Sequence, residues 1–75
     1  MTLQEKIEEC VRLYESEKWT KEFALHRKED GSWSASIGGH WAVSLGEWEG
    51  DLWTEGLPSA DEAVDQLLKK IKEQR

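Results

Sequence analysis

Apolar residues recur at helical spacing near the start of the chain. Leu3 begins a stripe at i, i+4, i+7, i+8 and i+11, which predicts an amphipathic helix whose stripe consists of Leu3, Ile7, Cys10, Val11 and Tyr14. Thr2 and Glu5 have the spacing of a capping box, so the helix is predicted to begin after Thr2. We expect it to end near Glu15 or Ser16.

A second helix is predicted after Pro58. Ser59 has the place of an N-cap and Glu62 that of its capping-box partner. The apolar face that follows consists of Ala60, Ala63, Val64, Leu67, Leu68 and Ile71. Both helices carry one apolar face, so both must pack on another layer.

The middle of the chain alternates between large apolar and small or polar residues, with the period of half-buried strands. Three strands are predicted over residues 19–27, 33–37 and 41–45. A short fourth strand over 47–54, after a turn at Glu49-Gly50, stays open.

The turns are predicted from the requirement that large residues share one face. A three-residue loop over 29–31, with Gly31 left-handed, pairs Arg27 with Trp33 and Phe23 with Ile37. A two-residue loop would mix the faces.

The same reasoning places a second turn at Gly38-Gly39-His40 and pairs Ile37 with Trp41. The predicted fold is therefore α+β, in the order helix, three or four antiparallel strands, helix, with both helices on one face of the sheet.

Length makes large side chains important for stability. A chain of 75 residues is predicted to form a single domain, residues 1–75, that buries only roughly 60% of its unfolded surface. Cys10 is the single cysteine, which excludes an internal disulfide, and its place on the helical stripe predicts a buried thiol. Trp33 and Trp41 are assigned to the core, whereas Trp19 could be core or surface.

Charge limits the partners. Sixteen acidic against ten basic side chains give a net charge of −6. This charge argues against direct nucleic-acid binding and against an anionic membrane surface. It fits solubility alone, a protein partner with a basic surface, or mimicry of a nucleic acid. With no long apolar run and no charged leader before an apolar stretch, we expect a cytoplasmic protein.

Two further tryptophans lie between glycines in an acidic segment. The predicted partner-binding residues are Trp48, Trp53, Glu47, Glu49, Asp51 and Glu55. Such tryptophans could clamp a cation, a base or a sugar ring. Alternatively, they close the open end of the sandwich.

The small-residue face of the predicted sheet is a candidate dimer face. Its residues are Ser32, Ser34, Ser36, Ala42 and Ser44. Exposed sheet faces usually carry longer side chains, so we expect either this face or an edge strand to contact a second copy. The alternative is a solvated face.

Catalytic patterns are absent from the sequence. It has no nucleophile elbow, no phosphate-binding glycine loop, no calcium-loop spacing and no cysteine pair for zinc. We expect no enzyme activity, no catalytic residue, no cofactor and no metal.

Two segments carry a resemblance to a known family. Residues 29–37, with an acidic-glycine turn before a strand, and residues 55–64, with a glycine before a capped helix, resemble the HicB-type antitoxin domain within residues 29–71. The order of elements also resembles double-stranded RNA-binding domains, but Asp61 and Glu62 stand where those have a basic cluster, so RNA binding is not carried over.

Together these patterns predict a small acidic, non-enzymatic interaction protein. We expect a homodimer that binds a macromolecular partner as an antitoxin-like inhibitor or as a phage or mobile-element inhibitor. A nucleotide or sugar binder that uses tryptophan stacking and a purely structural subunit are the alternatives.

Overall fold

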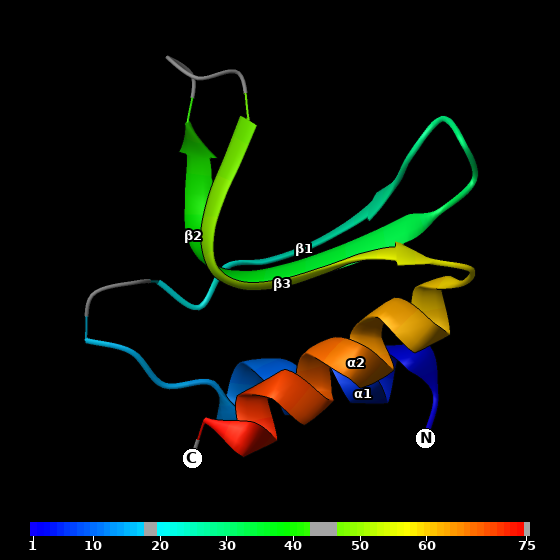
Figure 1. Ribbon diagram of the computed structural model, residues 1–75. Coiled ribbons are helices and arrows are strands. Elements are labelled where there is room, and N and C mark those ends of the chain that lie inside the picture. The colour runs from blue at the N-terminus through cyan, green and yellow to red at the C-terminus, as the bar shows by residue number, and fades with distance from the viewer. Residues whose placement is uncertain (18–19, 43–46, 75) are drawn as a thin grey trace.

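The computed structural model describes residues 1–17, 20–42 and 47–74, with backbone only for 40–42 and 47–50. The elements follow in the order α1 (Leu3–Leu13), β1 (Phe23–Arg27), β2 (Trp33–Ala42), β3 (Glu47–Leu57) and α2 (Ala60–Glu73). The strands form an antiparallel sheet in the order β1-β2-β3, and both helices lie on one side of it (Figure 1). The predicted α+β fold is confirmed.

Both helices begin where the sequence predicts. The Thr2 hydroxyl accepts from the Glu5 amide at 3.2 Å, and the Glu5 carboxylate accepts from the Thr2 amide at 3.0 Å, which completes a capping box. The Ser59 hydroxyl likewise accepts from the Glu62 amide at 3.2 Å. α1 ends slightly earlier than predicted, because Tyr14 takes an extended backbone and leads the chain out of the helix.

The first hairpin has the predicted register. Arg27 lies opposite Trp33 and Phe23 opposite Ile37. Gly31 has a φ of 88°, the left-handed conformation that the three-residue loop requires. The first turn is therefore confirmed at the level of individual pairs.

The predicted second turn is wrong. Gly38, Gly39 and His40 lie within β2, which continues to Ala42. Gly39 pairs with Gly50 of β3, so Glu49-Gly50 is also strand rather than turn. The predicted fourth strand is thus the third, and the predicted strand over 41–45 divides between the end of β2 and residues 43–46, which lie outside the described residues.

A bend in the hairpin explains this error. Gly38 has a φ of 74°, so the chain changes direction there without leaving the ladder to β3. Beyond the bend, the β2–β3 hairpin rises from the side of the sheet opposite the helices (Figure 1). Two adjacent glycines are a turn signal in sequence, but here they permit a bend within a strand.

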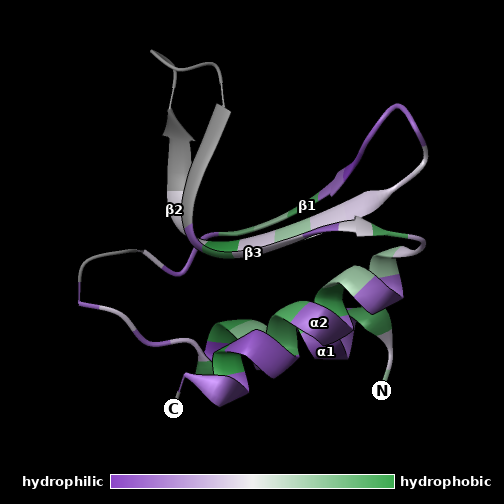
Figure 2. Cartoon of the chain, viewed as in Figure 1, coloured by the Kyte–Doolittle hydropathy of each residue, from purple (hydrophilic) through white to green (hydrophobic). Residues whose placement is uncertain are grey.

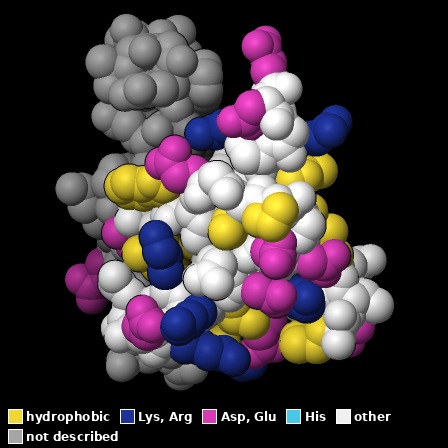
Figure 3. Space-filling view, turned by 45° about the vertical axis from the view of Figure 1, so that its right-hand side comes forward, with side chains coloured by type: hydrophobic (Ala, Val, Ile, Leu, Met, Phe, Trp, Pro, Cys, Tyr) yellow, Lys and Arg dark blue, Asp and Glu magenta, His cyan; other side chains and the backbone are white. Residues whose placement is uncertain are grey.

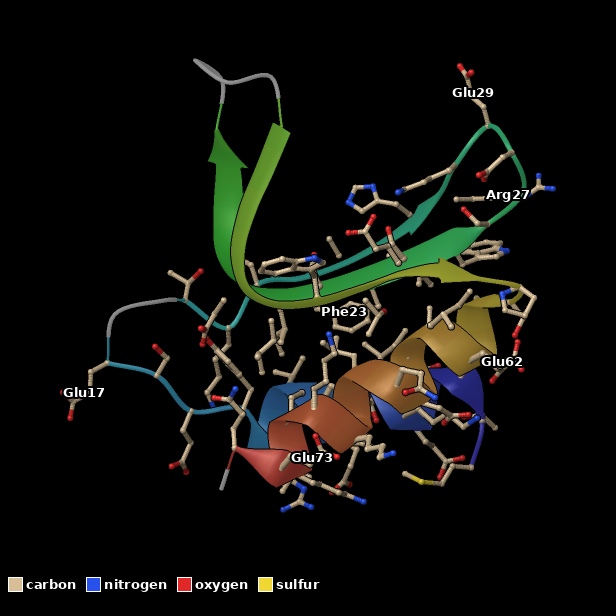
Figure 4. The ribbon with its side chains drawn as sticks, viewed as in Figure 1. Glu17, Phe23, Arg27, Glu29, Glu62 and Glu73 are labelled. Carbon is tan, nitrogen blue, oxygen red and sulfur yellow. The ribbon has the colours of Figure 1, made fainter. Side chains whose placement is uncertain are left out.

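The core lies between the sheet and the helices, where Figure 2 shows apolar residues gathered on the facing sides. Phe23 points from the sheet towards the helices (Figure 4). The buried residues are Cys10, Tyr14, Ala35, Ile37, Leu52, Ala63, Val64, Leu67, Leu68 and Ile71. Trp33 packs against them while partly exposed, as its assignment to the core predicted. The side chain of Trp41, and Trp19 as a whole, lie outside the described residues.

Polar contacts fasten α1 to α2. The Lys6 ammonium lies 3.2 Å from the Asp61 carboxylate and 3.1 Å from that of Asp65. Cys10 is fully buried, as predicted, and its thiol faces the Val64 carbonyl at 4.0 Å. Burial raises the pKa of the Cys10 thiol to about 11, so the thiol remains protonated at neutral pH.

Tyr14 joins α1 to the bend in the sheet. Its side chain is only 3% exposed, and its hydroxyl donates to the Asp51 carboxylate at 2.7 Å. A Cβ atom at Gly38 would lie 2.0 Å from the Tyr14 hydroxyl oxygen. Gly38 is therefore required for two reasons, its left-handed backbone and the close approach of the tyrosine.

Gly38→Ala should destabilise the protein far more than Gly31→Ala. Both glycines have positive φ, so each alanine pays about 1–2 kcal/mol for its backbone conformation. A Cβ at Gly31 meets nothing within 4 Å, whereas one at Gly38 overlaps Tyr14. We expect an additional loss of at least about 2 kcal/mol for Gly38→Ala in urea unfolding. Equal losses in the two variants would contradict the proposed packing of Tyr14.

Tyr14→Phe should lower stability and flatten its decline at alkaline pH. Burial and the Asp51 hydrogen bond raise the pKa of Tyr14 above its ordinary value of 10.0. The unfolded chain therefore loses this proton first, so the stability due to Tyr14 is complete below pH 10 and is lost as pH rises through the folded pKa. We expect Tyr14→Phe to cost about 1–2 kcal/mol at neutral pH.

The measurement is urea unfolding of both proteins at neutral and alkaline pH. Every other ionisable group is common to both proteins, so the difference between them reports on Tyr14. If wild type and Tyr14→Phe lose stability in parallel above pH 10, the tyrosine proton is not held by the fold.

Candidate partner-binding face

The sheet residues that alternate with the core point away from the helices. We call this surface the outer face; it consists of Ala24, His26, Ser34, Ser36, Trp53 and Glu55. Their neighbours in the strands, such as Ile37 and Leu52, are buried against the helices. The outer face is therefore the part of the sheet that a partner could reach.

Among the described side chains, Trp53 is the large apolar residue of this face. Its side chain is 52% exposed, and it lies directly opposite Ser36 of β2. Ser36 itself is only 5% exposed, and its hydroxyl has no hydrogen-bond partner among the described residues. The exposed indole of Trp53 thus has a small, buried serine as its neighbour on β2.

Two hydrogen bonds hold Trp53 in place. Its indole Nε1 donates to the Glu55 carboxylate at 3.3 Å, and its backbone carbonyl accepts from the Lys70 ammonium at 2.6 Å. Because Trp53 lies on an edge strand, its carbonyl is free to point outward, where the side chain from α2 reaches it. The indole is exposed and yet anchored at both its ring and its backbone.

Glu55 supplies a negative charge beside the indole. The Lys28 ammonium lies 3.2 Å from its carboxylate, with side chains 47% and 61% exposed. Hydrogen bonding and attraction from Lys28, followed by the Trp53 hydrogen bond, lower the pKa of Glu55, so it is ionised at neutral pH. An ion pair this exposed adds little stability, so a partner can replace Lys28 at low cost. Charges of both signs lie close together in the surface view of Figure 3.

The structure brings together only part of the predicted partner-binding set. Trp53 and Glu55 meet on the outer face, whereas Asp51 is half-buried and accepts the Tyr14 hydrogen bond. Asp51 therefore has a structural partner in the fold. The backbones of the other three residues lie in β3, but their side chains lie outside the described residues: Glu47, Trp48 and Glu49.

The predicted dimer face is also divided. Ser32 donates its amide and hydroxyl to the Asp30 carboxylate at 2.9 and 2.7 Å, and Ser34 is partly exposed. Ser36 is buried, so its side chain offers little surface to a second copy. The side chain of Ala42, and Ser44 as a whole, lie outside the described residues.

Sequence reasoning missed the two lysines that support this face. Lys28 shares the parity of the polar strand positions, which could have placed it near the outer face. Lys70 could not be found in this way, because its contact with Trp53 depends on how α2 packs beneath β3.

A cavity of about 440 Å³ lies beside Tyr14, between the C-terminal ends of the two helices and β3. Its lining residues are Leu13, Tyr14, Glu15, Asp51, Leu52, Ile71 and Gln74. Tyr14 and Asp51 are bonded to each other there, so their polar groups serve the fold rather than a ligand.

Among residues 1–17, 20–42 and 47–74, no group of three or more His, Cys, Asp or Glu side chains could hold a metal ion. In the same part of the chain, no helix is sufficiently long and apolar to cross a bilayer. No protein-family model, no curated protein and no solved structure matches this chain.

Proposed function

We propose that this protein is a non-enzymatic interaction module that binds a basic surface of a protein partner through Trp53 and Glu55. The observation that carries the proposal is the anchored, 52% exposed indole of Trp53 on the outer face. The resemblance of residues 29–37 and 55–64 to the HicB-type antitoxin domain suggests the role of an antitoxin-like or phage-type inhibitor.

Anchoring makes Trp53 suited to binding. Tryptophan is among the residues that most often dominate interface energies, because it buries a large area at little cost in side-chain entropy. The bonds to Glu55 and Lys70 have already restricted the indole and its backbone before a partner arrives. A restricted side chain loses less freedom on binding, so more of the buried area contributes to affinity.

The charge of the chain favours a basic partner. A net charge of −6 attracts cationic surfaces and speeds their approach. On the outer face, an arginine or lysine of the partner would exchange with Lys28 at Glu55. Glu47, Trp48 and Glu49 are the other partner contacts that the sequence predicts, and their backbones belong to β3.

The exposure of Trp53 bears on the two alternatives. A purely structural subunit with every tryptophan buried fits poorly with an indole that is half exposed in the single chain. A ligand that stacks on Trp53, such as a nucleotide or a sugar, uses the same indole but does not need the acidic charge. Salt dependence therefore separates this alternative from the protein partner.

Trp53→Ala should abolish most of the binding. The partner would be captured on the immobilised protein, identified, purified and then titrated by calorimetry. We expect Trp53→Ala to weaken binding by about 2 kcal/mol or more, roughly thirtyfold. Glu55→Gln should cost less, because Lys28 already neutralises that carboxylate in the free protein, and high salt should weaken the wild type.

Glu73→Gln is the matched control, since it removes one exposed carboxylate at the end of α2, away from the outer face. Binding unchanged by Trp53→Ala, or lost equally in Glu73→Gln, would contradict the proposed site. Salt-independent quenching of tryptophan emission by nucleotides or sugars, absent in Trp53→Phe, would favour the small-ligand alternative.

A further inference from the structure

The two edges of the sheet differ in how they are occupied. The sheet order leaves β1 at one edge and β3 at the other. On the β3 edge, Lys70 reaches over the strand and occupies the Trp53 carbonyl at 2.6 Å. A carbonyl that already accepts from Lys70 is not free to accept from a further strand. The β1 edge is therefore the one that a further strand can join.

The hydrogen bonds at both ends of β1 show which of its backbone groups face outward. The Gly38 amide donates to the Glu22 carbonyl at 3.0 Å, and the Lys28 amide donates to the Ser32 carbonyl at 2.8 Å. Even-numbered residues of this strand thus bond to β2. The odd-numbered residues Phe23, Leu25 and Arg27 direct their amides and carbonyls towards the free edge.

The sequence of this edge is complementary to itself. Leu25 is the centre of the segment, and the residues three and four positions away on its two sides carry opposite charges. Glu22 and Lys28 lie three residues away from it, and Lys21 and Glu29 lie four residues away. Two such segments in antiparallel register would bring opposite charges together at both ends, with Phe23, Leu25 and Arg27 between them.

We propose that β1 pairs with β1 of a second copy of the chain, antiparallel and with the two-fold axis at Leu25. Leu25 then lies opposite the partner's Leu25, and Phe23 lies opposite the partner's Arg27. These outward-facing positions supply the hydrogen bonds of the new ladder. The three-stranded sheets of the two copies become one continuous sheet of six strands.

Side chains support this pairing as well as the backbone. Glu22 lies opposite the partner's Lys28, and Lys21 comes near the partner's Glu29 where the hairpin loop begins, twice each in the symmetric dimer. Glu29 lies in the exposed hairpin loop, with Arg27 near by in β1 (Figure 4). Phe23 and Leu25 pack against the core but stay partly exposed in the single chain, and the second sheet would cover them further.

The dimer leaves Trp53 free, and Lys28, which contacts Glu55 in the single chain, would also face Glu22 of the partner subunit. Trp53 lies on β3, separated from the β1 edge by β2. A dimer built on β1 would present two outer faces, each with its own anchored indole. The inference does not depend on the proposed function, because self-association is measured without any partner.

Charge reversal and restoration test the pairing by sedimentation velocity over a wide range of concentration. We expect the wild type to dimerise and Glu22→Lys, which places two lysines opposite each other twice per dimer, to weaken the dimer about tenfold or more. The double variant Glu22→Lys with Lys28→Glu should restore it. Glu73→Lys is the matched control, with the same change in net charge on α2, and should dimerise like the wild type.

A second pair avoids the contact between Lys28 and Glu55. Lys21→Glu should weaken the dimer, and Lys21→Glu with Glu29→Lys should restore it, since both residues are exposed. Hydrogen exchange supplies the register: the Leu25 amide should be protected in concentrated and not in dilute solution. The proposal would be overturned by a wild type that stays monomeric at high concentration. It would equally be overturned if neither charge reversal changed the dissociation constant of the dimer.

Discussion

The contact of Tyr14 with Gly38 and Asp51 is the constraint on which the shape of this protein depends. One side chain at the end of α1 fills the inside of the bend in β2 and donates a hydrogen bond to β3. The bend needs a residue without a Cβ, since any side chain at Gly38 would overlap the tyrosine. The contact thus joins a helix and both strands of the long hairpin, and it directs the rest of the hairpin away from the helices (Figure 1).

The packing of α1 and α2 against each other and against the sheet supports this bend. Lys6 holds two carboxylates of α2, and the buried face of α2 contributes five residues to the core. Because no internal disulfide is available to a chain with one cysteine, these 75 residues depend on such packing for their stability. The helices cover one face of the sheet only, so the opposite face stays available for contact.

Each surface of the sheet therefore has a distinct character. The inner face is apolar and closed by the helices, and the outer face carries an indole whose position is set by Glu55 and Lys70. Lys70 also occupies a carbonyl on the β3 edge, which leaves β1 as the more open edge. Packing of α2 under β3 thus influences both the presentation of Trp53 and the edge at which the sheet could grow.

Local signals in the sequence predicted much of the fold. The caps at Thr2 and Ser59, both amphipathic helices and the register of the first hairpin depend on residues close together in the chain, and each is found in the structure. The pair Gly38-Gly39 carries the local signal of a turn, but its partner Tyr14 comes from another element, so the bend could not be distinguished from a turn. Asp51 was predicted as a partner contact for the same reason, because its bond to the tyrosine spans 37 positions.

The sequence by itself determined the helices, the large-residue face of the sheet and the acidic charge, because these follow from periodicity and composition. It also indicated the tryptophans of the acidic segment without deciding which of them is exposed. Only the tertiary structure decided that Trp53 is an anchored surface residue and that Asp51 belongs to the fold. The physical reason is that both outcomes depend on contacts between elements far apart in the chain, namely α1 with the bend and α2 with the edge of β3.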